Sequence, residues 1–260
     1  MGVALRFLYS DLTNGYNNST SGNSGEMKPG WTMAADVNLY YHQPIDIAMG
    51  TSYFNLGFAL KNLGGKMTYN DYTKNFIPTT MSIGAGYELP FDNYNRLQFA
   101  IEADKTLVPT TYSKYGNTVD GSKSSAEYPD GLPQFDNYGY SKLSSPNGWW
   151  QSFCDAPGYT TDEGKVVSAG MEEFQEVRWG AGIEYTYNHQ FFARAGYSHE
   201  HPTKGNRRLF EVGAGFHLSI VNFDVSYTIA TASTNPLNNT MRFTLGFDLA
   251  GIKDLVNNKR

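Results

Sequence analysis

Apolar and polar residues alternate with a period of two along most of this 260-residue chain. In MRFTLGFDL at 241–249, every second residue is apolar, and the residues between them include Arg242 and Asp248. Successive side chains of a strand point to opposite faces of a sheet, so the pattern predicts strands with one apolar and one polar face. Ten segments show it: 3–10, 35–41, 55–61, 81–88, 96–104, 177–187, 191–198, 210–220, 222–229 and 241–249.

The connections between these segments alternate in length, and no convincing amphipathic helix lies in them. Short connections lie near 42–46 and at 91–96, 187–192 and 219–224, and longer ones at 11–31, 69–76, 109–174, 199–207 and 232–239. The architecture is therefore predicted to be an up-and-down antiparallel meander. Short turns on one rim and long loops on the other are typical of outer-membrane barrels, with periplasmic turns and extracellular loops. Both chain ends then fall on the periplasmic side.

The residues of the polar face indicate whether the apolar face lies in a protein core or in lipid. A soluble β-sandwich would bury the apolar face in a core, whereas a transmembrane β-barrel would turn it toward lipid. The polar face repeatedly carries ionisable residues of both signs, and tyrosines recur near the strand ends of the apolar face, as in a membrane aromatic girdle. The barrel is therefore favoured. A charge network is predicted in its lumen, formed by Arg6, Asp36, Glu88, Glu102, Asp104, Arg178, Glu184, Arg194, Glu211, Asp224, Arg242 and Asp248.

Composition narrows the possible functions. A net charge of −5 and a pI near 5.5 give no indication of nucleic-acid binding. No apolar run approaches the length of a membrane-spanning helix. The single cysteine, Cys154, excludes an intrachain disulfide and a cysteine-based metal cluster. His199 and His201 resemble a short metal-binding tract, but zinc needs three or four ligands and no further ligand is evident nearby, so no metal site is predicted.

No enzyme signature stands out in the sequence. The chain has no G-x-S-x-G, no Walker loop and no H-E-x-x-H. Carboxylates on the polar face have arginines on the same face as charge partners, which is a simpler account than acid–base catalysis. We therefore predict no catalytic residues and no cofactor.

Several sequence segments indicate a particular protein family in addition to the strand architecture. They are FNLGFALKNLGGKMTY (54–69), FIPTTMSIGAGYEL (76–89), DKTLVPT (104–110), QSFCDAPG (151–158), HEHPTKGNRRLFEVGAGF (199–216) and NPLNNTMRFTLGF (235–247). In combination they resemble the PorV family, the outer-membrane component of the Bacteroidetes type IX secretion system, which has a FadL-like barrel. Such barrels have fourteen strands. The resemblance therefore implies that an N-terminal part with about four strands is missing from this sequence, in which Met1 starts inside a strand and no signal peptide is visible.

The resemblance implies a non-enzymatic role in protein export. The protein would dock on the large translocon barrel, bind the C-terminal signal domain of exported cargo, and shuttle it to the attachment complex that contains a PorU-type sortase. One barrel domain is implied over 1–250, in outer-membrane lipid, with a long extracellular loop at 109–174 and a periplasmic tail at 251–260. Such a long loop with aromatic residues is a candidate partner or cargo surface. The candidate residues are Tyr128, Trp149, Trp150, Phe153, Asp155 and Pro157.

Two other functions fit an outer-membrane barrel. A FadL-like transporter of hydrophobic small molecules is the alternative that the ancestry allows, and it predicts an apolar pocket in the lumen. The residues predicted to face the lumen are mostly charged, polar or glycine, which argues against it. An outer-membrane lipase or protease would need a Ser/His/Asp cluster on one rim, and the sequence offers none.

Overall fold

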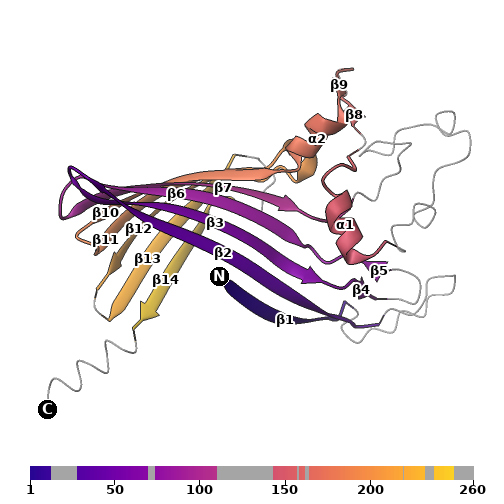
Figure 1. Ribbon diagram of the computed structural model, residues 1–260, viewed down its shortest axis with the longest axis horizontal. Helices are drawn as coiled ribbons and strands as arrows, with labels where there is room; N and C mark the ends of the chain where they lie inside the picture. The colour runs from indigo at the N-terminus through magenta and orange to yellow at the C-terminus, as the bar shows by residue number, and fades with distance from the viewer. Residues whose placement is uncertain are drawn as a thin grey trace, which may run out of the picture. The chain divides into compact units, whose positions relative to one another are not determined.

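The computed structural model describes residues 1–12, 28–69, 74–109, 143–156, 158–161, 164–218, 220–231 and 237–248. Ten long strands form one sheet in the order β1-β2-β3-β6-β7-β10-β11-β12-β13-β14, so each lies beside the next long strand of the chain (Figure 1). This confirms the predicted all-β fold. The strands are β1 (Gly2–Ser10), β2 (Gly30–Ile47), β3 (Gly50–Gly64), β6 (Thr80–Pro90), β7 (Asn95–Thr106), β10 (Arg178–Tyr187), β11 (Phe191–His199), β12 (Arg208–His217), β13 (Val221–Ala230) and β14 (Thr240–Phe247).

The chain divides into two compact units. Unit 1 comprises Met1–Leu39, Phe58–Ser82 and Asp104–Val177, and unit 2 comprises Tyr40–Gly57, Ile83–Ala103 and Arg178–Arg260. Unit 1 contains the short elements of the longer connections, whereas unit 2 contains the four short turns and the strands from β10 to β14. The short elements of unit 1 are β4 (Met67–Thr68), β5 (Lys74–Asn75), α1 (Ser145–Gln151), β8 (Tyr159–Thr160), β9 (Val166–Val167) and α2 (Ala169–Gln175).

The alternation of short and long connections agrees with the prediction. The short turns lie at 48–49, 91–94 and 188–190 and between β12 and β13. At the turn after β10, Asn188 and His189 both have a φ of 53°, and the N–H of Gln190 donates to the carbonyl of Tyr187 at 3.0 Å. Positive φ at both central residues is the type I′ geometry, which matches the twist of a tight hairpin.

Two predicted turn positions are wrong by a few residues. The expected turn near 42–46 lies inside β2, which continues to Ile47 and turns at 48–49. The segment expected to run to residue 220 ends at His217, because the N–H of Leu218 donates to the carbonyl of Val221 at 2.8 Å and closes the turn. At 42–46 polar residues and Pro44 interrupt the alternation although the strand continues, whereas Leu218 and Ile220 extend it past the end of β12, so the pattern alone does not mark the boundary.

The two helices of the long connection between β7 and β10 were not predicted. Each has seven residues, which is about two turns and too short to establish a helical period. α1 carries Pro146 in its first turn, and the hydroxyl of Ser168 accepts the N–H of Met171 at the start of α2. In the described part of the chain, no helix has the length and apolar character needed to cross a membrane.

The burial of the two faces of the sheet is the reverse of that in a soluble protein: apolar side chains are exposed and polar side chains are buried. On β2, Thr32 and Asp36 are buried, whereas Trp31 and Met33 are 63% and 66% exposed. Large apolar side chains are exposed on the same face of other strands too, as at Leu5, Phe7, Ile101, Phe243 and Leu245. Exposed apolar residues alternating with enclosed polar residues are what a lipid-facing sheet requires.

A small apolar core in unit 1 covers part of the polar face near the long connections. Ala34 of β2, Met67 of β4 and Ile77 form a buried cluster, and Leu8 and Tyr69 pack against it. Hairpin β4–β5 brings Met67 into this position. The absence of a side chain at Gly30 leaves room for the Met67 side chain, because a Cβ at residue 30 would lie 2.7 Å from the Cγ of Met67. The hairpin therefore acts as a cover over this end of β1 and β2.

We predict that Phe243→Arg destabilises the protein in a bilayer far more than Thr244→Arg. Phe243 is exposed on the apolar face of β14, whereas Thr244 lines a cavity on the polar face of unit 2. An arginine on the lipid side costs about 2–4 kcal/mol at the bilayer midplane. Urea titration of the two variants in lipid vesicles measures the difference, and equal losses of unfolding free energy would contradict the lipid-facing assignment.

Candidate functional site

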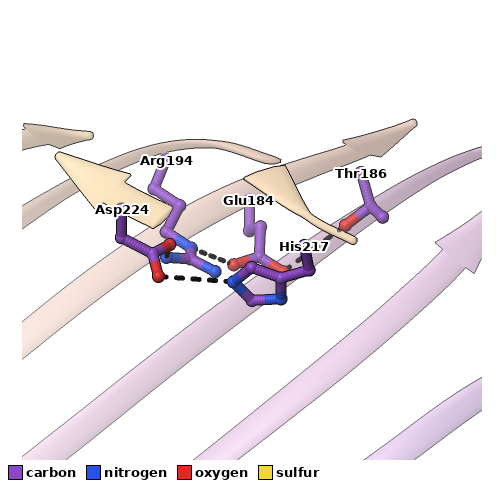
Figure 2. A network of polar contacts seen from close by, with 5 residues as sticks. All are labelled: Glu184, Thr186, Arg194, His217 and Asp224. Atoms are coloured by element: carbon purple, nitrogen blue, oxygen red, sulfur yellow. Dashed lines mark hydrogen bonds and ion pairs between the residues drawn. The ribbon is translucent and has the colours of Figure 1, made fainter. Parts of the chain in front are cut away.

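A chain of charged side chains crosses the polar face of unit 2 (Figure 2). Arg194 of β11 forms ion pairs with Glu184 of β10 and, at 2.8 Å, with Asp224 of β13. The second carboxylate oxygen of Asp224 lies 3.3 Å from Nε2 of His217, and Thr186 donates to Glu184 at 3.4 Å. One guanidinium thus joins carboxylates from two strands that are not neighbours in the sheet.

The register of the strands and two glycines explain how Arg194 reaches both partners. Arg194 lies directly opposite Glu184 on β10 and Gly213 on β12, and Asp224 lies opposite Gly215. β12 therefore presents no side chain at the two positions that the guanidinium must cross. A Cβ at Gly215 would overlap Oδ1 of Asp224, the oxygen that Arg194 binds.

An aromatic residue supports the same cluster. The ring centre of Phe192 lies 4.4 Å from the ring centre of His217. It lies 5.2 Å from Cζ, the guanidinium carbon of Arg194. Stacking of arginine on an aromatic face adds to its interaction with carboxylates. His217 was not predicted in the network, although the alternating pattern places it on the polar face. Its partner is set by the turn between β12 and β13, which the sequence did not locate correctly.

A cavity of about 540 Å³ lies against this cluster. Its lining includes Glu184, Arg194, Glu211, Asp224 and Arg242, which are ionisable residues of both signs. A second cavity of unit 2, about 470 Å³, is lined mainly by glycine, alanine and polar residues and includes Glu102 and Glu211. Binding of an apolar molecule against such charges would cost their hydration without replacing it. These cavities are therefore poorly suited to a hydrophobic ligand.

The remaining predicted network residues make separate contacts. In unit 1, Arg6 pairs with Asp36 at 2.5 Å, and the other oxygen of Asp36 accepts the N–H of Asn62 at 2.8 Å. Other contacts are Ser82 with Asp104 at 2.5 Å, Thr228 with Glu211 at 2.9 Å, and the ion pair of Arg96 with Glu88. Arg178 begins β10, and the N–H of Asp248 donates to the carbonyl of Ile220 at 3.0 Å. The predicted residues are thus brought together in several clusters.

A second candidate site is the connection between β7 and β10, which we call the loop module and define as residues 143–177 of unit 1. Lys105, near the end of β7, lies 2.9 Å from a carboxylate oxygen of Glu173 and 2.8 Å from one of Glu176, both on or next to α2. Its side chain is only 5% exposed. A buried ammonium between two carboxylates holds α2 in a defined position on the strand end. This contact was not predicted, because a single lysine at a strand end has no distinctive spacing in the sequence.

Three further contacts fix the loop module. Oε1 of Glu173 accepts the N–H of Ala156, and Glu172, which is buried, accepts the N–H of Gly158, both at 2.7 Å. On α1, Gly148 is buried against the ring of Phe76, where a Cβ would come within 2.5 Å. The acidic residues of α2 are therefore turned toward the protein, and α1 sits on the segment before β6.

The loop module leaves aromatic residues exposed. Trp150 and Phe174 are 76% and 71% exposed, and the ring centre of Phe153 lies 6.4 Å from that of Trp150. Of the other predicted surface residues, Trp149 and Asp155 are half-buried, whereas Tyr128 and Pro157 lie outside the described residues. The exposed residues make a partner surface possible, and no contact in the structure tests it.

The two histidines of the H-x-H sequence have other roles in the structure. The ring of His199 stacks on Trp179 at 5.3 Å between ring centres. Nδ1 of His201 accepts the N–H of Thr203 at 3.4 Å and caps the short 3₁₀ helix Pro202–Lys204. Burial lowers the pKa of His201, as do the charges of His199 and Lys204, which favours the neutral ring that this cap requires. Among the described residues, no group of three or more metal-ligating side chains comes together.

Three features define the class of this protein. They are the alternating faces of the sheet, the exposed apolar side chains, and the alternation of short and long connections. Together they are typical of an outer-membrane β-sheet protein. Residues 1–113 match the family model described as type IX secretion system protein PorV. The match agrees with the predicted resemblance to the PorV family over the first 113 of the 260 residues. A search of curated proteins finds no match.

We predict that Gly215→Ala breaks the contact between Arg194 and Asp224. The added methyl group displaces the Asp224 carboxylate, so stability should fall by about 1–2 kcal/mol, between the values for exposed and buried ion pairs. Gly182→Ala is the matched control, because its Cβ would lie at an ordinary 3.6 Å from the carbonyl of Ala195. Urea titration in lipid vesicles compares the two variants, and equal stability would show that the bridge contributes nothing.

We predict that Lys105→Met releases the loop module and leaves the strands intact. Removing the ammonium leaves the carboxylates of Glu173 and Glu176 close together without their cation, a change that typically costs about 3–5 kcal/mol for a buried pair. Hydrogen exchange and protease cleavage within 143–177 should increase, while exchange in β10 to β14 stays unchanged. Lys165→Met, at an exposed position in the same module, is the control. Unchanged protection in Lys105→Met would contradict the anchoring role.

Proposed function

We propose that this protein is an outer-membrane shuttle of the type IX secretion system. In this role it docks on the large translocon barrel and binds the C-terminal signal domain of exported cargo. It then passes the cargo to the surface attachment complex that contains a PorU-type sortase. The observation that carries the proposal is the match of residues 1–113 to the PorV family.

The loop module is the proposed contact surface. Trp150, Phe153 and Phe174 are exposed, while Lys105 and Gly148 anchor the module to the strand ends. Aromatic residues on an ordered support are the type that contributes most to protein–protein affinity. Trp149 and Asp155 belong to the same surface, and Tyr128 and Pro157 join it on the sequence argument alone.

The proposed orientation places the loop module outside the cell. The alternation of connections supports this, because outer-membrane barrels have short periplasmic turns and long extracellular loops. In this proposal the chain ends lie on the periplasmic side and 1–250 forms one barrel domain in the membrane, while the tail expected at 251–260 lies outside the described residues.

The cavity of unit 2 favours the shuttle over a transporter of hydrophobic molecules. A transporter needs an apolar path, whereas Glu184, Arg194 and Asp224 lie paired at the wall of the larger cavity. We assign these residues, and the other paired charges of the polar face, a structural role: each of these charges has a partner of opposite sign. In this proposal the protein has no catalytic activity and no cofactor.

The combined substitution of Trp150→Ala and Phe153→Ala tests the contact surface. Loss of two interface aromatics typically lowers affinity at least about tenfold. Cells carrying the double variant should secrete and attach less cargo, and less translocon barrel should co-purify with it from the outer membrane. Phe91→Ala removes an exposed aromatic residue at a short turn and should leave both measurements unchanged.

Two results would argue against the proposal. Normal cargo attachment in the double variant would contradict the role of the loop module. Uptake of fatty acids by the reconstituted protein, together with recovery of the protein without the translocon barrel, would support the transporter instead.

A further inference from the structure

Arg208 is a cation on the apolar face of unit 2. The polar face of β12 carries Glu211 and Gly213, which line the larger cavity, so Arg208 shares the opposite face with Phe210 and Val212. These two apolar side chains are 40% and 39% exposed. A charge on the lipid side of a barrel is tolerated near the membrane interface, where it reaches polar groups, and not at the midplane. Arg208 is the first residue of β12 and therefore lies at a strand end.

The guanidinium of Arg208 is incompletely paired. Its Nε is buried, and no residue in the described part of the chain accepts a hydrogen bond from it. The carboxylate of the preceding loop, Glu200, is bound by Arg207 instead, through Nε at 2.8 Å and Nη2 at 3.3 Å. A buried donor without a partner is destabilising, and more so when it is charged. An acceptor from outside the chain would remove this cost.

Three rings lie beside Arg208 on the same face. His199 is directly opposite Arg208 in the register of β11 and β12. The ring of Trp179 stacks on that of His199 at 5.3 Å, and Tyr197 meets Trp179 edge to face at 5.7 Å, as measured between ring centres. Trp and Tyr on the apolar face near a strand end are typical of the membrane interface. Arg208 is thus placed at the depth of lipid head groups.

An apolar groove on the same face includes one of these rings. Its volume is about 440 Å³, and it is lined by Leu56, Ile101, Trp179 and three alanines, among them Ala103. The three large side chains are exposed on the lipid side of the sheet. Glu102 also borders the groove, but it lines the second cavity on the polar face as well. The volume lies in the range of small-molecule pockets, about 300–1,000 Å³. Trp179 therefore joins an apolar groove to the cluster around the unpaired cation.

We propose that Arg208 and this groove bind one phosphate-bearing membrane lipid. The phosphate accepts hydrogen bonds from the guanidinium of Arg208, and an acyl chain lies in the groove past Trp179. The planar fork of arginine matches phosphate oxygens better than a point charge does. An apolar protein surface would fill the groove but leave the guanidinium without an acceptor, and a dissolved phosphate would leave the groove empty. The site does not depend on the proposed role in secretion.

A comparison of two lipids on the full chain tests the site. Phosphatidic acid and diacylglycerol with the same acyl chains differ only in the phosphate. Native mass spectrometry of the protein released from detergent measures the dissociation constant of each lipid. We expect phosphatidic acid to bind at least about tenfold more tightly, which corresponds to one hydrogen bond between charged groups.

Substitutions of the arginine connect that preference to the proposed phosphate contact. Arg208→Gln should weaken binding of phosphatidic acid about tenfold or more and leave that of diacylglycerol unchanged. Arg208→Lys keeps the charge but not the fork, so its effect should be intermediate. Lys165→Gln, which removes one positive charge at an exposed position of the loop module, is the control and should have no effect.

A substitution in the groove tests the acyl-chain contact separately. Ala103→Phe narrows the groove and should weaken both lipids, by about fourfold for each methylene that it displaces. Ala193→Phe is the matched control, because Ala193 lines a different apolar cavity on the same face. It should leave the binding of phosphatidic acid unchanged.

Four results would overturn the proposal. The first is equal binding of the two lipids, and the second is unchanged binding of phosphatidic acid in Arg208→Gln. The third is unchanged binding in Ala103→Phe, which would leave the groove without a role. The fourth is a protein dimer in place of the lipid complex, lost in Ala103→Phe, which would show that the groove is an interface between two copies of the chain.

Discussion

The structure depends on one constraint, which is that the large side chains of the sheet face outward. Trp31 and Met33 are mostly exposed, whereas Thr32 and Asp36 between them are buried. In lipid this arrangement is favourable, because the apolar face needs no core and the backbone groups are paired between strands. The same constraint places most ionisable residues of these strands on the other face, and Lys105, His199 and Arg208, near strand ends, are exceptions. Charge pairing there is a consequence of the alternation, since a charge that faces lipid has no means of compensation.

The pairing of those charges in turn requires strands without side chains at particular points. Arg194 binds Asp224 across β12 only because Gly213 and Gly215 leave the intervening strand bare. Glycine is unfavourable in a strand interior, where it loses entropy and contributes no packing. Its presence at 215 is explained by the close approach of the Asp224 carboxylate, whereas at 213 a Cβ would lie 3.0 Å from the carbonyl oxygen of Val225. The glycines and the arginine form one unit, although nothing in their sequence spacing connects them.

The period-two pattern predicted ten strands, their faces and the alternation of connections, because each depends on residues close together in sequence. Boundaries were less accurate: β2 continues through the expected turn because polar residues and a proline lie inside the strand, and residue 220 lies beyond the end of β12 because apolar residues also occur in turns. Most of the predicted charged residues lie on strands, and ion pairs involve Arg6, Asp36, Glu88, Glu184, Arg194 and Asp224. Their partners were not predictable, because register joins residues such as Arg6 and Asp36 that are thirty positions apart. The anchoring of α2 by Lys105 was missed for the same reason.

Lys105 also shows why an ordered loop suits a docking role. A buried ion pair adds little net stability, because desolvation offsets most of the attraction, but it defines geometry strictly. By joining Lys105 to Glu173 and Glu176, the fold fixes α2 before any partner arrives. A partner that meets Trp150 and Phe174 then does not have to order the backbone that carries them, and the entropy cost of binding is smaller. The match to the PorV family ends at residue 113, before the loop module begins, so the support for a docking role in this region comes from the anchoring contacts themselves.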